Sequence, residues 1–280
     1  MIIKDITEDT LVKKYTNTYE LSILIGVDSF DYMVLDGQQQ VLALKTFGLQ
    51  NETGSHLAAV EAAFQAEKFL HQPFRNIRVG FVSGRNTLLP QRLYDENENE
   101  AYLRQITELL PGEAARADAL PVLSLYNVYA AALDEITLAR RLFPGCRIFH
   151  ITTALLEGLR HLAVQQERRS IFAHLKDGML FVVLFEGKEL LFANAFPYQA
   201  AKDFIYFILL VFQQFGLQPE SQTLHLSGQL LPDSEIYREA LRYIRNLEFV
   251  PAPAFFKFGP RISQEPHYLY FGLLSLSLCT

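Results

Sequence analysis

Side chains of the types used in catalysis occur throughout this sequence, but they do not stand at the usual catalytic or metal-binding spacings. The seven histidines form no HxxxH or HExxH pair, the spacings that bring two imidazoles to one helix face as zinc ligands. Ser227 lies outside a GxSxG motif and is interpreted as a turn serine rather than a nucleophile. Neither GxGxxG nor GxxxxGKS/T occurs, so no dinucleotide or P-loop phosphate site is predicted.

Composition narrows the class of protein further. The chain has 280 residues, of which 50% are hydrophobic and 20% charged, enough apolar material for a large core or for two lobes. The net charge of −6 argues against a general nucleic-acid binder, which needs surplus cations to neutralise phosphates. Cys146 and Cys279 form no CxxC motif, so neither a zinc site nor a disulfide framework is indicated.

Hydropathy favours a location in the cytoplasm. The longest strongly apolar run, Phe204–Phe212, is far shorter than the roughly 20 residues that a bilayer-spanning helix needs. The chain does not open on a basic segment followed by an apolar stretch, as a secretory signal would. We therefore expect a soluble, cytoplasmic protein without a membrane span.

The stretch from Ser170 to Gly228 organises the rest of the chain. Apolar runs alternate there with the turn pairs Asp177-Gly178 and Glu186-Gly187, which are typical of tight hairpins. The pattern predicts a three-strand meander, a helix and a fourth strand. The expected elements are strands Ile171–Lys176, Met179–Phe185 and Lys188–Phe196, the helix Ala200–Phe215 and the strand Thr223–Leu226.

A similar pattern occurs earlier in the chain. Asp36-Gly37 marks a hairpin turn, and we expect positive φ at Gly37 as at Gly187. A helix is predicted to begin near Leu57 and to end at Pro73, because apolar residues recur there at helical spacing. The expected strands are Leu21–Val27, Asp31–Leu35, Gln40–Phe47 and Ile77–Val82.

The two patterns indicate an internal duplication. Leu21 and Ile171 begin equivalent strands, and the turns at Gly37 and Gly187 follow with the same offset of 150 residues. Each fourth strand ends in Ser-Gly, followed shortly by Leu-Leu-Pro. Order, spacing and turn chemistry agree, so we predict an α/β protein with two similar lobes, residues 1–165 and 166–280.

The remaining segments connect and complete these repeats. Residues 1–18 are polar and without a sustained period, and are interpreted as a lead-in. A short strand is expected at Arg147–Ile151, with Thr152 or Thr153 capping the leucine-rich helix that follows. Residues 267–279 are interpreted as a terminal helix, although part of this stretch alternates and would also suit a strand.

Two repeats of strand–strand–strand–helix–strand–helix resemble the actin-like ATPase fold, a ribonuclease H-like architecture shared by sugar kinases, actin and large heat-shock chaperones. The sequence is more similar to the cell-division and pilus-assembly branch, which includes PilM, and most similar to a small bacterial family known only as a domain of unknown function. This resemblance implies two lobes, each with a mixed β-sheet flanked by helices. The segments that carry it are Tyr19–Ile23, Asn86–Pro90, Phe149–Thr153 and the link Ala195–Pro197.

The same resemblance implies where a nucleotide cleft would lie. In active members of the superfamily, the first turn of each meander is a glycine-rich loop that follows an Asp, and its N–H groups cradle phosphates. A later turn with paired glycines lets the backbone approach the adenosine. The matching positions here, expected to form a vestigial cleft, are Gly26, Asp28, Ser29, Lys176, Asp177, Gly178, Ser227 and Gly228.

The sequence departs from the active pattern in three places. Leu24 stands at the expected metal-side Asp of the first repeat, and His174 stands at that of the second. Of the paired glycines only Gly228 is present. We therefore expect no catalytic residue, no metal and no cofactor, and interpret the chain as a degenerate ATPase-fold protein that acts through an unknown protein partner. The alternatives are an ATPase or small-molecule kinase that binds ATP with magnesium through drifted motifs, and a small-ligand sensor that uses the cleft.

Overall fold

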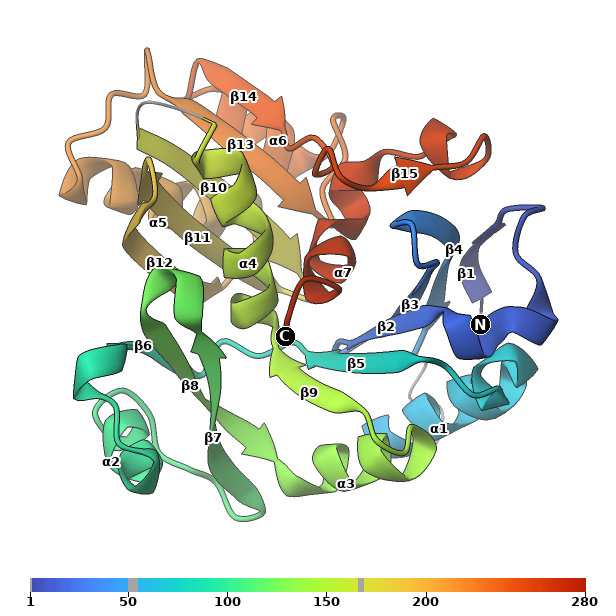
Figure 1. Cartoon of the computed structure of the whole chain (residues 1–280). Coiled ribbons are helices and arrows are strands. Elements are labelled where there is room, and N and C mark those ends of the chain that lie inside the picture. Colours follow the sequence, from blue (N-terminus) through green and yellow to red (C-terminus); the bar gives the residue numbers. More distant parts are fainter. Residues whose placement is uncertain (1, 50–54, 166–168) are drawn as a thin grey trace. The chain divides into compact units, whose positions relative to one another are not determined.

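The computed structural model of the chain describes residues 2–49, 55–165 and 169–280. These residues form an α/β protein whose chain divides into two compact units (Figure 1). The expected lobes, 1–165 and 166–280, stay a prediction, and the units differ from them because two C-terminal segments group with the first. The first unit comprises Met1–Glu157, Ala254–Glu265 and Gly272–Thr280, and the second comprises Gly158–Pro253 and Pro266–Phe271.

The main sheet of the first unit is built on an antiparallel meander. Strand β2 pairs with β3, β3 pairs with β4, and the chain then returns through a helix so that β5 lies parallel to β2. Strand β9 extends the sheet in parallel beyond β5. The strands are β2 (Glu20–Ile25), β3 (Ser29–Leu35), β4 (Gln40–Gly48), β5 (Asn76–Phe81) and β9 (Arg147–His150).

The edge of this sheet beside β4 is completed by segments from both ends of the chain. The expected lead-in is in fact strand β1 (Ile2–Thr7), which pairs antiparallel with β4. The short strand β15 (Lys257–Phe258) pairs with β4 in parallel. The three isoleucines of β1 follow no regular period and two of them are exposed, so the pairing with β4, rather than an apolar period, makes this segment a strand.

Side chains of β2 alternate between the two faces of the sheet. Leu21, Ile23 and Ile25 belong to a core that also contains Val60 and Phe64 of α1 and residues of α3. On the opposite face, Leu24 and Gly80 lie beside Leu276 of α7. The helices of this unit are α1 (His56–Ala66), α2 (Asn99–Arg104), α3 (Leu133–Leu142) and α7 (Phe271–Leu276).

A small antiparallel sheet is inserted between β5 and α3 (Figure 1). Helix α2 packs against it around the buried Leu103 and Val128. The two long strands of this sheet, one of them rich in alanine, pair with each other along their full length. The strands, in spatial order, are β6 (Asn86–Pro90), β8 (Leu125–Ala132) and β7 (Glu113–Leu120).

The second unit repeats the meander. Its sheet runs in the order β12-β11-β10-β13-β14, which matches β4-β3-β2-β5-β9 of the first unit position by position. Helices α5 and α6 share one core with the strands. The elements are β10 (Arg169–Lys176), β11 (Met179–Glu186), β12 (Glu189–Pro197), α5 (Ala201–Gln214), β13 (Thr223–Gly228), α6 (Glu235–Leu241) and β14 (Asn246–Phe249).

Helix α4 (Ile151–Ala163) continues from β9, and the division between the units falls within it. It begins at Ile151, so neither Thr152 nor Thr153 precedes it as a cap. Instead, Nδ1 of His150 accepts a hydrogen bond of 3.1 Å from the backbone N–H of Thr152. The expected terminal helix is shorter than residues 267–279, because a 3₁₀ turn precedes α7. The 3₁₀ turns are Lys13–Thr18, Lys68–His71, Gln91–Leu93, Glu96–Glu98, Pro121–Leu123, Ile262–Gln264 and His267–Tyr270.

The two hairpin glycines differ in conformation. Gly187 has a φ of 57°, as expected, but Gly37 is not among the residues with positive φ. In the β3–β4 turn, Gln39 takes the left-handed conformation with a φ of 62°. The carboxylate of Asp36 accepts hydrogen bonds from the N–H groups of Gln38 and Gln40, so this side chain builds a longer turn than the expected two residues.

Candidate functional site

The β10–β11 turn contains three of the predicted cleft residues and is very tight. Lys176 pairs directly with Met179, which leaves only Asp177 and Gly178 to make the turn. Their φ angles are 50° and 74°, the double left-handed conformation that a type I′ hairpin requires. The turn therefore consists of two residues only.

The side chain of Asp177 is held by neighbours within the second unit. The Gln229 amide nitrogen donates to Oδ1 of Asp177 at 3.0 Å, and its oxygen accepts from the Asp177 N–H at 2.8 Å. Nζ of Lys176 lies 3.6 Å from the same carboxylate oxygen. These contacts join the turn to Lys176 of β10 and to Gln229, which follows β13 and was not among the predicted residues.

His174 and Ser227 face each other on neighbouring strands, as the strand register requires. Nδ1 of His174 lies 2.9 Å from Oγ of Ser227, and both side chains are buried. Burial lowers the pKa of His174 to about 3, and the positive charge of Lys176 acts in the same direction. The imidazole is therefore neutral at physiological pH, and Ser227 is part of an internal hydrogen bond.

Gly228 allows β13 to approach β10 closely. Its φ is 85°, and a Cβ at this position would lie 2.1 Å from the carbonyl oxygen of Leu175. No side chain fits in that space. The glycine is thus required by strand packing, whether or not a ligand ever lies beside it.

The equivalent turn of the first unit contains the other predicted residues. The N–H of Gly26 donates to the carbonyl of Ser29 at 2.8 Å, which closes a short loop over Val27 and Asp28. Both of these loop residues are exposed, whereas Gly26 and Ser29 are buried. The Ser29 hydroxyl donates to a carboxylate oxygen of Asp31 at 3.4 Å. Gly26, Asp28 and Ser29 therefore come together in one turn.

Leu24 and His174 occupy matching places in the two repeats. Leu24 pairs with Gly80 across β2 and β5, and His174 pairs with Ser227 across β10 and β13. One residue further along, the carbonyls of Ile25 and Leu175 each accept a backbone hydrogen bond from the segment that leaves the parallel strand. The alignment at an offset of 150 residues is therefore correct at this position.

His56 connects the first turn to helix α3. Its Nε2 lies 2.8 Å from the Gly26 carbonyl, and its Nδ1 lies 3.6 Å from a carboxylate oxygen of Glu135. Burial raises the pKa of Glu135, and the nearby His56 partly opposes that rise. The two ring nitrogens therefore face two different acceptor groups, the Gly26 carbonyl and the Glu135 carboxylate. The pair lines a pocket of about 260 Å³ together with Gly26 and Val27.

A buried polar network lies where β7, β8 and β9 meet the start of α4. Asp118 accepts hydrogen bonds from the His150 N–H at 2.8 Å, the Thr153 hydroxyl at 2.7 Å and the Tyr129 hydroxyl at 3.1 Å. Asn127 donates to the Thr153 oxygen at 2.9 Å. Burial raises the pKa of Asp118 to about 6, although these donors oppose the rise. Burial lowers the pKa of His150 to about 3.

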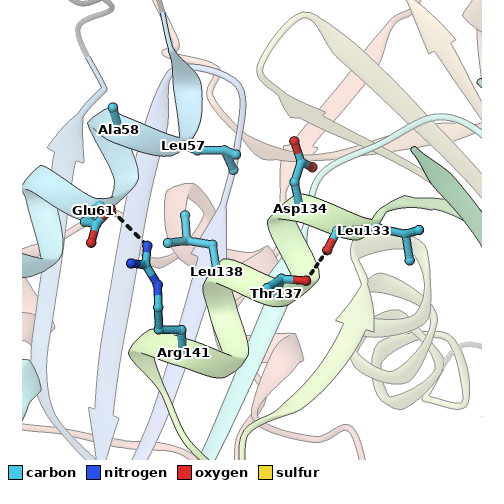
Figure 2. A pocket seen from close by; sticks show the side chains of 8 residues that line it. All are labelled: Leu57, Ala58, Glu61, Leu133, Asp134, Thr137, Leu138 and Arg141. Atoms are coloured by element: carbon cyan, nitrogen blue, oxygen red, sulfur yellow. Dashed lines mark hydrogen bonds and ion pairs between the residues drawn. The ribbon is translucent and has the colours of Figure 1, made fainter. Parts of the chain in front are cut away.

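A surface groove runs between α1 and α3 (Figure 2). It encloses about 490 Å³ and combines leucines on its walls with charged side chains at its rim. The ion pair between Arg141 and Glu61, at 3.0 Å, joins the two helices across it. The residues that line the groove are Leu57, Ala58, Glu61, Leu133, Asp134, Thr137, Leu138 and Arg141.

Sequence reasoning missed these last three features, because their members are far apart along the chain. Asp118 lies on a strand that was not predicted, and His56 and Glu135 are separated by more than a helix and a sheet. Among residues 2–49, 55–165 and 169–280, no group of three or more His, Cys, Asp or Glu side chains is arranged to hold a metal ion.

A family model described as "Protein of unknown function (DUF3822)" matches residues 8–247. The chain belongs to this family. No curated protein matches it. The resemblance to a bacterial domain of unknown function is therefore confirmed.

Solved structures show the fold of this DUF3822 chain. A Bacteroides thetaiotaomicron protein "with actin-like ATPase fold and unknown function" is similar at 21% identity and a TM-score of 0.77, over 86% of this chain and 94% of that one. The "PilM-PilN type IV pilus biogenesis complex" is similar at 15% identity and a TM-score of 0.65, over 92% and 97%. The ethanolamine utilization protein EutJ of Carboxydothermus hydrogenoformans follows at 10% identity and a TM-score of 0.50, over 97% and 95%.

These likenesses confirm the actin-like ATPase fold and the structural similarity to PilM. At identities below 25% they establish architecture rather than activity. In the part of the chain that the structure describes, no helix has both the length and the apolar character needed to cross a bilayer.

Proposed function

We propose that this DUF3822 chain is an actin-fold protein without ATP hydrolysis, and that it acts as an interaction or assembly factor by binding a protein partner. The observation that carries the proposal is the pair of uncharged residues, Leu24 and His174, at matching positions of the two repeats. By resemblance, these are the positions where active members place metal-side carboxylates.

The physical reason lies in the charge of the expected ligand. A magnesium–triphosphate complex in a desolvated cleft needs carboxylates that position the metal and its waters, and missing charge partners cost several kcal/mol. His174 is held neutral in a hydrogen bond to Ser227. Leu24 is 3% exposed in an apolar setting beside Leu276. Neither side chain supplies a metal ligand of the required type.

The two short turns support the same proposal. The Asp177-Gly178 turn is a two-residue hairpin whose aspartate is already bonded to Gln229. The equivalent turn of the first repeat is closed by a hydrogen bond between Gly26 and Ser29. We therefore propose that the eight predicted cleft residues are remnants with structural roles.

A protein partner is the class of ligand that we favour. One similar structure is a complex of PilM with PilN in type IV pilus biogenesis, so this architecture can act through a bound protein. The net charge of −6 disfavours nucleic acid as the partner. We propose a cytoplasmic location on the grounds of the sequence.

The test is a thermal-shift series on the full chain with millimolar ATP and magnesium, combined with an assay of phosphate release. A ligand at about 100 times its dissociation constant would stabilise the fold by about 2.7 kcal/mol, which raises Tm by several degrees for a protein of this size. We expect no shift and no phosphate release.

Two variants make the result decisive. A magnesium-dependent rise in Tm that disappears in Asp28→Ala or Asp177→Ala would favour the alternative, a nucleotide-binding ATPase or kinase with drifted motifs. Glu220→Ala, an exposed acidic residue outside both turns, is the matched control and should leave any such shift unchanged.

A further inference from the structure

The groove between α1 and α3 has an apolar interior that is open to solvent. Leu57 of α1 lies close to Leu138 of α3, and Leu133 at the start of α3 lines the hollow farther along (Figure 2). Leu133, the first residue of α3, is 48% exposed. The hollow has a volume of about 490 Å³. Covering an exposed leucine there with another apolar side chain removes apolar surface from water, which is favourable in free energy.

At one end of the groove the charges neutralise each other. Arg141 and Glu61 form an ion pair of 3.0 Å across the helices, so each compensates the charge of the other. The hydroxyl of Thr137 donates to the carbonyl of Leu133 at 2.7 Å. These polar groups already have partners and do not require a ligand.

The other end carries an excess of negative charge. Asp134 is exposed at the first turn of α3, and its carboxylate accepts a hydrogen bond of 2.8 Å from the neighbouring N–H of Glu135. Within the described ranges 2–49, 55–165 and 169–280, no cationic side chain forms an ion pair with it. The next residue, Glu135, faces His56 and is not among the residues that line the groove. A cation from outside would therefore find an unpaired carboxylate at this end.

We propose that this groove binds a short extended segment of a protein partner, which places apolar side chains on Leu57, Leu133 and Leu138 and a lysine or arginine on Asp134. The proposal rests on the proposed function and names the chemistry of its partner. From Leu133 to Arg141 the helix rises about 12 Å, which corresponds to about four residues of extended chain. A segment of that size fills the groove from the ion pair to the acidic end.

The probe is an array of eight-residue peptides, randomised at four central positions and flanked by glycine and serine. The full chain is applied to the array, and selected peptides are then labelled with fluorescein for anisotropy titrations. We expect selected peptides to combine apolar residues with lysine or arginine and to lack aspartate and glutamate.

Charge exchange tests the orientation. Asp134→Lys should weaken the binding of the basic peptides at least tenfold. Peptides in which glutamate replaces the basic residue should bind this variant more tightly than they bind the wild type. Leu133→Ser should weaken peptides of either charge. The matched controls are Glu98→Lys and Leu110→Ser, exposed positions outside the groove, and they should leave affinities within twofold.

Three results would overturn the inference. The array could select nothing above the flanking sequence, or Asp134→Lys could leave charge preference unchanged. Sedimentation velocity of the chain alone could instead show a dimer that Leu133→Ser dissolves, which would assign the groove to a second copy. Magnesium–ATP results separate this inference from the proposed function: an ATP-dependent Tm rise refutes the latter alone, and failed peptide binding without such a rise refutes only the former.

Discussion

Gly228 offers the sharpest test of the packing described above. Replacement by alanine introduces a Cβ that would lie 2.1 Å from the carbonyl oxygen and 2.9 Å from the backbone nitrogen of Leu175. Both separations are far inside van der Waals contact, so β13 must move away from β10. The variant should therefore disturb the parallel pairing at the centre of the second unit's sheet.

The expected cost has two parts. A left-handed φ, here 85°, costs an L-residue about 1–2 kcal/mol. Moving the strand end weakens the hydrogen bond of 2.7 Å from Gln229 to Leu175 and its neighbours, each worth about 1 kcal/mol net. We expect Gly228→Ala to lower the free energy of unfolding by at least about 3 kcal/mol.

Two other glycines separate these contributions. Gly187 has a φ of 57°, and no atom lies within 4 Å of the place that a Cβ would take, so alanine there should cost only about 1 kcal/mol, for the backbone conformation. Gly37 has neither positive φ nor a close neighbour, and alanine there should be neutral or stabilising by up to about 1 kcal/mol.

The assay is urea denaturation of the full chain followed by far-ultraviolet circular dichroism, with the three variants measured in parallel. The order of loss should be Gly228→Ala, then Gly187→Ala, then Gly37→Ala. A Gly228→Ala variant that loses no more stability than Gly187→Ala would refute the close approach of β13 to β10.

Two further predictions concern polar contacts. Burial raises the folded-state pKa of Asp118 to about 6, above the unfolded value near 3.9, so its contribution to stability is complete below about pH 4 and is lost as pH rises through 6. The unfolding free energy of wild type relative to Asp118→Asn should therefore increase by about 2 kcal/mol from pH 7 to about pH 4.5; a difference independent of pH would contradict the buried placement. Gln229→Ala should accelerate hydrogen exchange at the Asp177 amide, its donor at 2.8 Å, by several-fold to about tenfold for a bond worth about 1 kcal/mol, and unchanged protection there would show that Gln229 does not hold the turn.

The second repeat could be predicted closely from sequence because local signals agree there. The first hairpin turn lies at Asp177-Gly178 as expected, and the second lies at Gly187 and Lys188, one residue later than the expected Glu186-Gly187. The helix expected at Ala200–Phe215 is observed at Ala201–Gln214. Turn chemistry and apolar runs suffice where neighbouring strands are consecutive in the chain.

Strands that depend on distant partners were missed. The sequence of β7, Glu113–Leu120, contains four alanines, which have low strand propensity. It forms a strand because β8 supplies a complete antiparallel partner from Ala132 to Leu125. Strand β1 has three isoleucines without a regular apolar period, and it is defined by its pairing with β4. In both cases the tertiary pairing outweighs the local preference.

The candidate site likewise has features that a local sequence pattern predicts and features that depend on contacts between distant segments. The offset of 150 residues identified Leu24 and His174 as equivalent, and their cross-strand partners confirm it. No local sequence pattern indicated the contact between His56 and Glu135 or the groove between α1 and α3. Both features arise because these two helices pack side by side. A sequence pattern can identify a repeated position, but it does not identify contacts between separate helices.

The equivalent inner position is uncharged in both repeats, with different chemistry in each. In the first, Leu24 and Leu276 close over Gly80, where a Cβ would lie 3.0 Å from both leucines. In the second, a neutral His174 bonds to Ser227 at 2.9 Å. Burying an isolated carboxylate at either place would be unfavourable without a cation beside it. Under the proposed function no metal lies at these positions, and the uncharged residues found at both of them avoid the cost of burying an unpaired carboxylate.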